Sequence, residues 1–416
     1  MWIKKKAKFM FCAFMAILTT LSIVALAGVC YMNNVLPKEY SVISGTKLTV
    51  KSLVPIKAVY SGESLSEFKI SKNTPEKYSV NLKAFGIIPI KSANVRVVSK
   101  TDVLVLGNPF GIKIYTDGVM VVDLDTVITE KGKVSPGVKA GLKKGDIIIS
   151  INGIKVFSNE DVARIIENSN GKELTLKVKS DEKTKKLTIK PEMCYQSGKY
   201  KTGIWVRDSS AGIGTLTFYS PALNTVCGLG HGIYDADTGK LLTLNSGELV
   251  KAEILDISVG KSGSPGELIG RFKEQKISNL KINNETGVFG NCNIGYDNNS
   301  LTQLALKQEI AVGDAEILTT TNGEIPKLFK CKIEKIAHNN SITKNMVIKI
   351  TDEELISKTG GIVQGMSGSP ILQNGKLVGA VTHVLVDDPT RGYAIFAENM
   401  LETAQGVAEE KLKDAS

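Results

Sequence analysis

The sequence of 416 residues is poor in the residues that build metal sites and disulfide frameworks. It has three histidines, at positions 231, 338 and 383, and none of them belongs to the HExxH motif of zinc proteases. Its six cysteines include no CxxC pair, so they give neither a zinc-binding spacing nor a disulfide framework. We expect buried free thiols, with a Cys292–Cys331 disulfide as the alternative, and we expect no metal and no cofactor.

Aromatic residues are also scarce, at 6% of the chain with two tryptophans. The formal net charge is +10, but the lysines are scattered and are not interleaved with aromatic side chains. Nucleic-acid surfaces combine a clustered basic patch with such side chains, so we expect no nucleic-acid partner. The positive charge indicates solubility or weak attraction to an anionic membrane surface. The length predicts two or three domains.

One long apolar run is present, at residues 9–32, after a short tail at residues 1–8 that contains four lysines. A run of this length can span a bilayer as a helix, which needs about 20 residues. The lysines favour a cytoplasmic tail and export of everything after the run. A cleavable signal peptide is the alternative, because residues 25–27 (Ala-Leu-Ala) resemble a signal-peptidase site. The run is longer than an ordinary signal, which favours an uncleaved anchor.

The next segment, residues 33–99, combines a polar spacer with a short β region. Strand-like alternation is found at residues 78–82 and 95–98. Ser, Lys, Glu and Gly dominate the stretch 33–75, which predicts a flexible spacer.

Residues 100–190 contain a segment typical of a peptide-binding module. The stretch SPGVKAGLKKGDIIISINGIKV, residues 135–156, resembles the PDZ domains of bacteria. A helix follows at 159–168, capped by Ser158 with Asp161 at the capping-box spacing. The alternative is a domain that packs on its neighbours and binds no free peptide terminus.

The PDZ resemblance implies a carboxylate-binding loop and an edge strand to which a peptide terminus adds. The matching residues here would be Phe110, Gly111 and Ile112, before the strand 112–114 and facing the helix 159–168. Glycine lets successive amides point one way, which suits an anion-binding loop.

Residues 191–416 are rich in short strands separated by Gly, Asn, Asp and Ser clusters, the pattern of a β-barrel or sandwich. The segment GMSGSP, residues 365–370, precedes a strand–Asn-Gly–strand hairpin at 370–381. A serine between glycines can expose its hydroxyl on a tight turn, while the amides of Gly365 and Ser367 face a developing oxyanion. An apolar helix face is expected at residues 398–413.

A serine nucleophile needs a base and a group that orients this base. His231 is the candidate base because it follows an apolar strand in a glycine-rich segment, whereas His338 lies in a polar loop. His383 is close to Ser367 in sequence and is expected on a strand, Thr382-His383-Val384, that pairs with substrate. Asp352 is the candidate acid, although it also suits the first turn of a helix. Asp256 and Asp314 remain as alternatives.

Three long stretches resemble the sporulation stage IV protein B (SpoIVB) peptidase family. They are residues 203–239 (GIWVRDSSAGIGTLTFYSPALNTVCGLGHGIYDADTG), 260–272 (GKSGSPGELIGRF) and 359–396 (TGGIVQGMSGSPILQNGKLVGAVTHVLVDDPTRGYAIF). The resemblance implies a mainly β chain with some α: a transmembrane helix, a PDZ domain and a trypsin-like double β-barrel at 191–416. It also implies a triad of His231, Asp352 and Ser367.

The resemblance further implies an exported, membrane-anchored signalling protease of the forespore, facing the space between forespore and mother cell. Such a protein cleaves itself, and residues 37–75 are the segment expected to contain the cut. It then cuts the extracellular part of a membrane-bound regulatory protein of an intramembrane protease complex, which triggers processing of pro-sigma-K. The PDZ domain would bind peptide termini.

Two other functions are compatible with this sequence. One is an exported PDZ scaffold with an inactive protease domain, against which the intact Ser367 and His231 segments argue. The other is a quality-control protease of the HtrA type, in which the protease normally precedes its PDZ domains. A second Ser-Gly-Ser-Pro, residues 262–265, is expected to be a structural loop in which Ser264 is dispensable.

Overall fold

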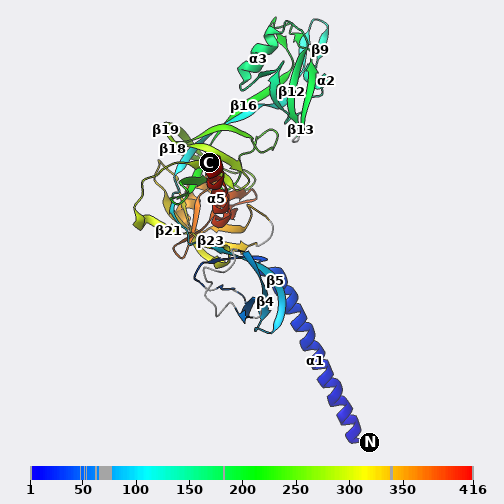
Figure 1. Cartoon of the computed structure of the whole chain (residues 1–416), viewed down its shortest axis with the longest axis vertical. Coiled ribbons are helices and arrows are strands. Elements are labelled where there is room, and N and C mark those ends of the chain that lie inside the picture. The colour runs from blue at the N-terminus through cyan, green and yellow to red at the C-terminus, as the bar shows by residue number, and fades with distance from the viewer. Residues whose placement is uncertain are drawn as a thin grey trace. The chain divides into compact units, whose positions relative to one another are not determined.

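The computed structural model describes residues 2–46, 48–50, 52, 54–60, 63–64, 77–180, 183–337 and 341–414. Strands predominate and helices are few (Figure 1), as predicted. His338 and much of the expected self-cleavage segment 37–75 lie outside the described residues. Two compact units are present: residues 1–101 with 303–312 and 336–341, and residues 102–302 with 313–335 and 342–416. The six cysteines are all free, so the Cys292–Cys331 disulfide is not formed.

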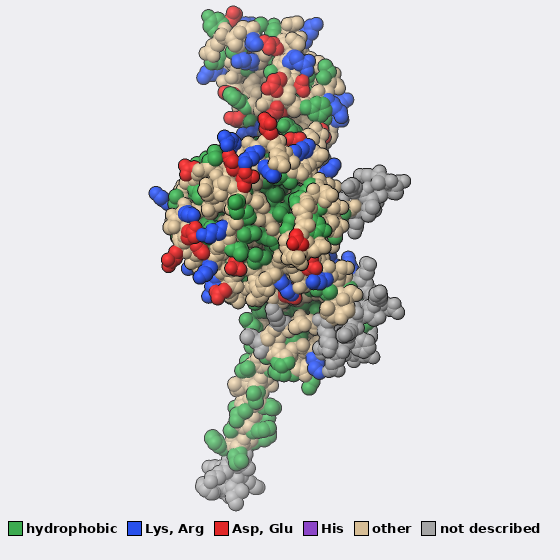
Figure 2. Space-filling model, turned by 90° about the vertical axis from the view of Figure 1, so that its left-hand side faces the viewer, with side chains coloured by type: hydrophobic (Ala, Val, Ile, Leu, Met, Phe, Trp, Pro, Cys, Tyr) green, Lys and Arg blue, Asp and Glu red, His purple; other side chains and the backbone are tan. Residues whose placement is uncertain are grey.

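The first unit consists of helix α1 (Trp2–Val35) and a five-stranded sheet in the order β1-β5-β4-β2-β3. The stretch Phe9–Val35 has a mean hydropathy of 2.4 and is long and apolar enough to cross a membrane. Apolar side chains surround this helix (Figure 2) and are exposed. The strands are β1 (Glu39–Ile43), β2 (Ile56–Tyr60), β3 (Glu63–Ser64), β4 (Lys77–Ala84) and β5 (Ile88–Val98). The predicted strands 78–82 and 95–98 are therefore confirmed. The predicted flexible spacer at 33–75 is wrong in part, because β1, β2 and β3 of the sheet lie within it.

The second unit contains a first barrel of six strands. They pair in a closed circuit, β7-β16-β17-β20-β19-β18 and back to β7, and β6 adds to β16. The bounds are β6 (Asp102–Val105), β7 (Pro109–Leu124), β16 (Ile204–Ser220), β17 (Thr225–Gly228), β18 (Leu244–Ser258), β19 (Glu267–Asn284) and β20 (Gly287–Asn291). Buried side chains such as Phe110, Leu249 and Val288 fill this barrel.

A second barrel is closed in the order β22-β23-β24-β27-β26-β25, which confirms the predicted double β-barrel. Its strands are β22 (Gly313–Thr319), β23 (Lys327–Ile336), β24 (Met346–Ile350), β25 (Pro370–Gln373), β26 (Lys376–Leu385) and β27 (Asp388–Phe396). Helix α4 (Glu353–Thr359) lies between β24 and β25. The predicted C-terminal helix is α5 (Ala397–Asp414), which buries Met400, Leu401 and Ala404. Short elements are β21 (Leu301–Gln303), η1 (Asn298–Ser300) and η2 (Lys307–Glu309).

The PDZ-like elements lie within the first barrel's sequence, between β7 and β16. They are β8 (Val127–Thr129), β9 (Gly132–Val134), α2 (Pro136–Lys139), β10 (Ile147–Ile151), β11 (Ile154–Lys155), α3 (Asn159–Asn168), β12 (Leu174–Ser180), β13 (Lys183–Ile189), β14 (Glu192–Met193) and β15 (Tyr200–Lys201). They enclose a separate core that includes Ile148, Ile151 and Leu176. The Ser158 cap of α3 is confirmed, because its side chain accepts from the Asp161 amide.

This insertion corrects the predicted boundaries of 100–190 and 191–416. The strand β7 is continuous: its first half pairs with β18 in the barrel, and its second half pairs with β10 in the PDZ sheet. The protease fold therefore begins before the PDZ domain and resumes after it.

Candidate active site

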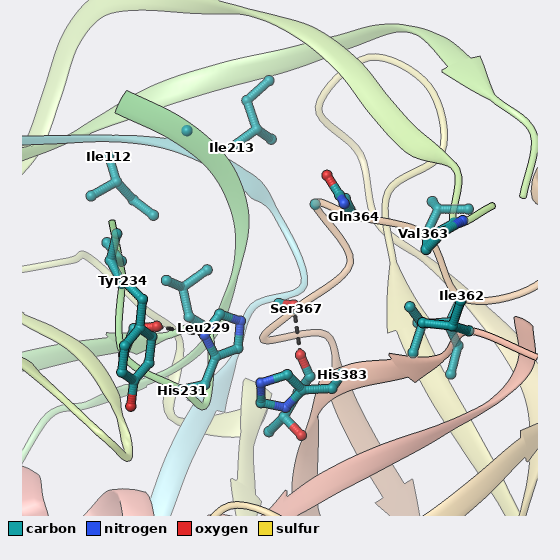
Figure 3. Close-up of a pocket in the computed structure, with 18 of the residues that line it drawn as sticks. Ile112, Ile213, Leu229, His231, Tyr234, Ile362, Val363, Gln364, Ser367 and His383 are labelled. Atoms are coloured by element: carbon teal, nitrogen blue, oxygen red, sulfur yellow. Dashed lines mark hydrogen bonds between the residues drawn. The ribbon is translucent and has the colours of Figure 1, made fainter. Parts of the chain in front are cut away.

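Residues from both barrels meet around a cavity of about 510 Å³ in the second unit. Its lining includes His231, Ser367 and His383 (Figure 3), with apolar side chains such as Ile112, Ile213 and Ile362 around them. The structure thus brings together the predicted nucleophile and the predicted base, which are 136 residues apart in sequence (367 − 231).

The loop that carries Ser367 is held by the first barrel. The Thr215 amide donates to the Ser367 carbonyl at 2.9 Å, and its hydroxyl donates to the Gly365 carbonyl at 2.8 Å. The hydroxyl of Thr217 donates to the Gly368 carbonyl at 2.8 Å. These two threonines were missed in the sequence, where their alternation in β16 indicates only a strand. They tie the loop of the predicted nucleophile to the barrel that carries the predicted base.

Glycine is required at Gly368 for two reasons. Its φ of +94° lies in the left-handed region, which residues with a Cβ avoid. A Cβ there would also lie 2.0 Å from the Thr215 carbonyl oxygen and 2.5 Å from the Leu229 nitrogen. The backbone of the nucleophile loop can approach β16 this closely only without a side chain.

The backbone amides around Ser367 support the predicted oxyanion site. The amides of Met366, Gly368 and Ser369 donate to backbone carbonyls. Among the described residues, the amides of Gly365 and Ser367 donate no hydrogen bond. Donors that are already placed and unused are what a developing negative charge requires. The oxyanion role itself stays a prediction.

His231 follows β17, after Leu229 and Gly230, both of which have positive φ angles. Its Nδ1 lies 2.7 Å from the Gly232 carbonyl oxygen, so Nδ1 carries the proton and donates. The other nitrogen, Nε2, is then left as a proton acceptor. Burial lowers the pKa of His231, which keeps the ring neutral and able to accept a proton at pH 7.

His383 lies beside the candidate base. The two rings have centroids 4.9 Å apart and an interplanar angle of 36°. Desolvation, followed by the neighbouring charges of His231 and Lys344, lowers the pKa of His383 to about 4. The residues Thr382, His383 and Val384 all line the cavity on β26, although pairing with substrate stays a prediction.

The Ser367 hydroxyl donates to the Thr382 carbonyl at 2.8 Å (Figure 3). The proton of the nucleophile thus points toward β26 in this structure. This hydroxyl has to release the Thr382 carbonyl before His231 can accept its proton.

Asp352 does not reach the imidazole. It is the N-cap of α4, and its carboxylate accepts from the backbone amides of Glu354, Leu355 and Lys330. Asp352 directly precedes the first helical residue, Glu353, so it caps the helix and does not lie in its first turn. The predicted carboxylate–imidazole contact is therefore not formed, and Asp352 does not line the cavity.

The two alternative acids, Asp256 and Asp314, do not take the place of Asp352 beside His231. The Asp256 carboxylate accepts from the Ile257 amide, and the Asp314 carbonyl accepts from Gln373. No Asp or Glu is among the described residues that line the cavity. Nor do the described residues contain a group of three or more His, Cys, Asp and Glu side chains that could hold a metal ion.

The predicted PDZ loop, Phe110-Gly111-Ile112, was wrong. These residues lie in β7 and pair on both sides, with β16 and β18, so their amides are part of the barrel. Phe110 is fully buried, and a Cβ on Gly111 would lie 2.6 Å from the Phe272 ring. Ile112 lines the cavity around Ser367 instead.

The PDZ domain has its own cavity of about 710 Å³. Helix α3 contributes Val162 and Ile166, and the start of β16 contributes Ile204 and Trp205. The strand beside α3 thus comes from residues C-terminal to the helix, where the sequence carries no recognisable loop motif.

Comparisons with known proteins agree with this architecture. Residues 198–401 match the family model described as SpoIVB peptidase S55, and residues 127–180 match a PDZ domain model. The regulator of sigma-W protease RasP of Bacillus subtilis is 36% identical over 76 residues, which is 18% of this chain and 17% of RasP. The chain therefore spans less than one fifth of that relative.

Two solved structures are similar to parts of the chain. The PDZ domain of the SdrC-like protein from Listeria monocytogenes is 24% identical, with a TM-score of 0.18, and the match covers 22% of this chain and 87% of that domain. The active form of Rv3671c protease from M. tuberculosis is 15% identical, with a TM-score of 0.25, over 48% of this chain and 74% of that protein. The two family matches thus show a PDZ domain at residues 127–180 and a segment of the SpoIVB peptidase S55 family at residues 198–401 in this chain.

Proposed function

We propose that the chain is a serine endopeptidase in which Ser367 is the nucleophile and His231 is the general base. The observation that carries this proposal is the meeting of both residues in one cavity beside two unused amides. Because the cavity is lined by residues of both barrels, an extended peptide would lie along β26 with its scissile carbonyl over Ser367.

The chemistry follows from the hydrogen bonds. The Ser367 hydroxyl leaves the Thr382 carbonyl, gives its proton to Nε2 of His231, and its oxygen attacks the scissile carbonyl. The amides of Gly365 and Ser367 hold the resulting oxyanion. The imidazolium then donates its proton to the leaving amine as the C–N bond breaks. Water, deprotonated by the same ring, hydrolyses the acyl-enzyme and restores the serine.

The orientation of the base is the part that differs from the predicted triad. In this structure the Gly232 carbonyl accepts from Nδ1 and fixes the tautomer. A triad with Asp352 would require α4 to release its N-cap, because three backbone amides now occupy that carboxylate. We therefore assign the chemistry to Ser367 and His231 and treat Asp352 as a cap in the state described.

The biological role that we propose is that of an exported, membrane-anchored signalling protease of sporulation. The family match, the apolar helix α1 and the PDZ domain support it. In this role the protein cleaves itself within residues 37–75 and then cuts a membrane-bound regulator of an intramembrane protease, so that pro-sigma-K is processed. The PDZ domain would bind peptide termini in the groove beside α3, at the forespore membrane.

A fluorophosphonate probe and mass spectrometry test the enzymatic part. Full-length protein should be labelled at Ser367 and should produce N-terminal fragments, whereas Ser367→Ala should do neither. Ser264→Ala is the matched control and should behave as wild type. Equal labelling of wild type and Ser367→Ala would contradict the assignment. Wild type that stays intact and unlabelled would favour the PDZ scaffold instead.

A further inference from the structure

The hairpin that joins β4 to β5 ends in an apolar tip. Phe85 is 59% exposed, Ile87 is 78% exposed and Ile88 is 40% exposed. The remainder of β4 alternates in the normal way, with Tyr78 and Val80 buried in the core of the first unit. The exposed apolar side chains thus lie in the turn and at the first residue of β5, where polar residues are usual.

The backbone of this turn makes the apolar sequence more unusual. Phe85 and Gly86 have φ angles of +53° and +76°, and the Ile87 amide donates to the Ala84 carbonyl. This is the geometry of a type I′ turn, for which Asn-Gly is the favoured pair. An aromatic residue in the left-handed region is unfavourable, so its presence indicates that the Phe85 side chain has a role outside the turn.

The tip lies on the same side of the first unit as the exit of α1. Strand β1, which follows α1, runs parallel to β5 and pairs Glu39 with Asn94, so β5 leads back toward the helix. Lys91 donates through Nζ to the carbonyls of Asn33 and Leu36 at the end of α1. The tip is therefore beyond the point where β5 contacts the helix end, and Figure 1 shows the hairpin beside the last turns of α1.

The position of the bilayer follows from the helix length. Counted from Phe9, about 20 residues cross the hydrocarbon core, which places its far boundary near Gly28. The remaining turns to Val35 extend about 10 Å further, through the headgroup layer. In these turns Val29 and Met32 are partly covered, and Met32 packs on the core of the unit. The hairpin tip thus lies at the depth of the boundary between headgroups and acyl chains.

The charges around the tip fit an anionic surface. Lys57 extends across the turn, since a Cβ on Gly86 would lie 3.1 Å from its Cδ. Lys83 precedes the turn by two residues, and Lys38 lies close enough to Lys91 for their charges to interact. Lysines that flank an apolar tip are typical of segments that insert into an interface containing anionic lipid.

We propose that residues 85–88 form a membrane-insertion loop, which dips into the anionic leaflet from which α1 emerges and holds the first unit against the bilayer. The loop and α1 then make two attachments to the membrane. The proposal rests on α1 spanning the membrane and does not depend on proteolytic activity. It can therefore be tested in the inactive Ser367→Ala protein.

Spin-label depth measurements on the full chain test the loop. The exposed Cys12 and Cys30 are replaced by alanine, and single cysteines are introduced by Ile87→Cys or, as the control, Ser44→Cys. Ser44 follows β1 at the opposite end of the β1–β5 pairing and is exposed. The background without an introduced cysteine corrects for labelling of the other four thiols.

The proteins are reconstituted in vesicles of phosphatidylcholine with phosphatidylglycerol. We expect the label at position 87 to be accessible to oxygen and protected from a water-soluble nickel chelate, about 5–10 Å below the phosphates. The label at position 44 should be fully accessible to the chelate. Equal chelate accessibility at both positions would overturn the proposal. An unchanged depth in pure phosphatidylcholine would overturn the anionic part of it.

A second variant separates insertion from folding. Phe85→Asn supplies the residue that the turn geometry favours, and we combine it with Ile88→Ser and the label at position 87. We expect chelate accessibility to rise several-fold while Phe85→Asn alone raises the melting temperature. A lower melting temperature with an unchanged label depth would show that the apolar tip serves folding only, and would overturn the proposal.

Discussion

The tetrapeptide Ser-Gly-Ser-Pro occurs twice in this chain, at residues 262–265 and 367–370, and the two copies have different roles. Both glycines adopt the left-handed region, with φ of +78° at Gly263 and +94° at Gly368. A Cβ on Gly263 would meet nothing within 4 Å, whereas one on Gly368 would clash with β16. The local conformation is therefore shared, and the surroundings create the difference.

The serines of the two copies differ in the same way. The Ser262 hydroxyl donates to the Asp387 carbonyl in an exposed loop, and Pro265 of this copy contributes to the cavity lining. The Ser367 hydroxyl lies within the cavity, and Ser369 is fully buried with its hydroxyl donating to Thr319. A nucleophile turn is thus defined by what the second barrel and β16 place around it.

The largest difference in activity is expected between the variants in which the first serine of each tetrapeptide, Ser367 or Ser262, is replaced by alanine. Ser367→Ala removes the nucleophile and should lower kcat/KM for peptide cleavage by about 10⁴-fold or more, as loss of a triad serine does. Ser262→Ala should leave it within about twofold, because that hydroxyl contacts only a loop carbonyl. Steady-state assays of the full-length proteins measure both. A comparable loss in Ser262→Ala would erase the distinction.

The next largest difference is expected in the stability of variants at the two glycines, Gly263 and Gly368. Gly263→Ala should lower the free energy of unfolding by about 1–2 kcal/mol, because alanine is unfavourable in the left-handed region. Gly368→Ala adds a clash with two backbone atoms of the first barrel, which costs a further 1–3 kcal/mol or so. Denaturant unfolding of the two variants measures the difference. If both lose the same stability, the close approach of the nucleophile loop to β16 is not real.

The pH dependence of cleavage tests the environment of His231, the proposed general base. Burial lowers the pKa of His231, so the neutral base persists as the pH falls below the ordinary histidine pKa of about 6.5. The acidic limb of kcat/KM should therefore lie below pH 6.5, with activity falling about tenfold per pH unit beyond it. The profile of kcat/KM from pH 4 to 8 measures this limb. A limb above pH 6.5 would mean that a nearby charge stabilises the imidazolium.

Replacing the second serine of each tetrapeptide, Ser369 or Ser264, should change the free energy of unfolding by modestly different amounts. Ser369→Ala leaves the buried Thr319 hydroxyl without its donor and should cost about 1–2 kcal/mol. Ser264→Ala should cost less than about 0.5 kcal/mol, because exposed positions tolerate such changes. Thermal unfolding of the two variants gives the comparison. An equal loss of stability in both variants would show that the buried Ser369–Thr319 hydrogen bond does not stabilise the fold.

A small activity change is also expected at Asp352. Asparagine is as good an N-cap as aspartate, so Asp352→Asn should keep kcat/KM within a few-fold, while Asp352→Ala loses about 1 kcal/mol of stability. Kinetics and unfolding of this pair measure the two effects. A loss of about 10⁴-fold in Asp352→Asn would instead show that the carboxylate moves to His231 in the active state.

Much of the fold was predictable because its signals are local. The capped helix α3, the apolar run in α1 and the Asn-Gly hairpin after Ser367 depend on short-range patterns, and the structure contains all three. The insertion of the PDZ domain was not predictable. A strand such as β7 has the same sequence pattern whether its second half pairs within a barrel or in another sheet.

The sequence by itself determined the types of residues available for chemistry: one serine between glycines before a hairpin, three histidines and no metal motif. Only the tertiary structure decided which of them meet. The position of His231 beside Ser367, the use of Asp352 as a cap and the place of Phe110-Gly111-Ile112 in a barrel all depend on pairings between distant segments. Such pairings arise from burial and backbone hydrogen bonding across the whole sheet, which no short stretch of sequence contains.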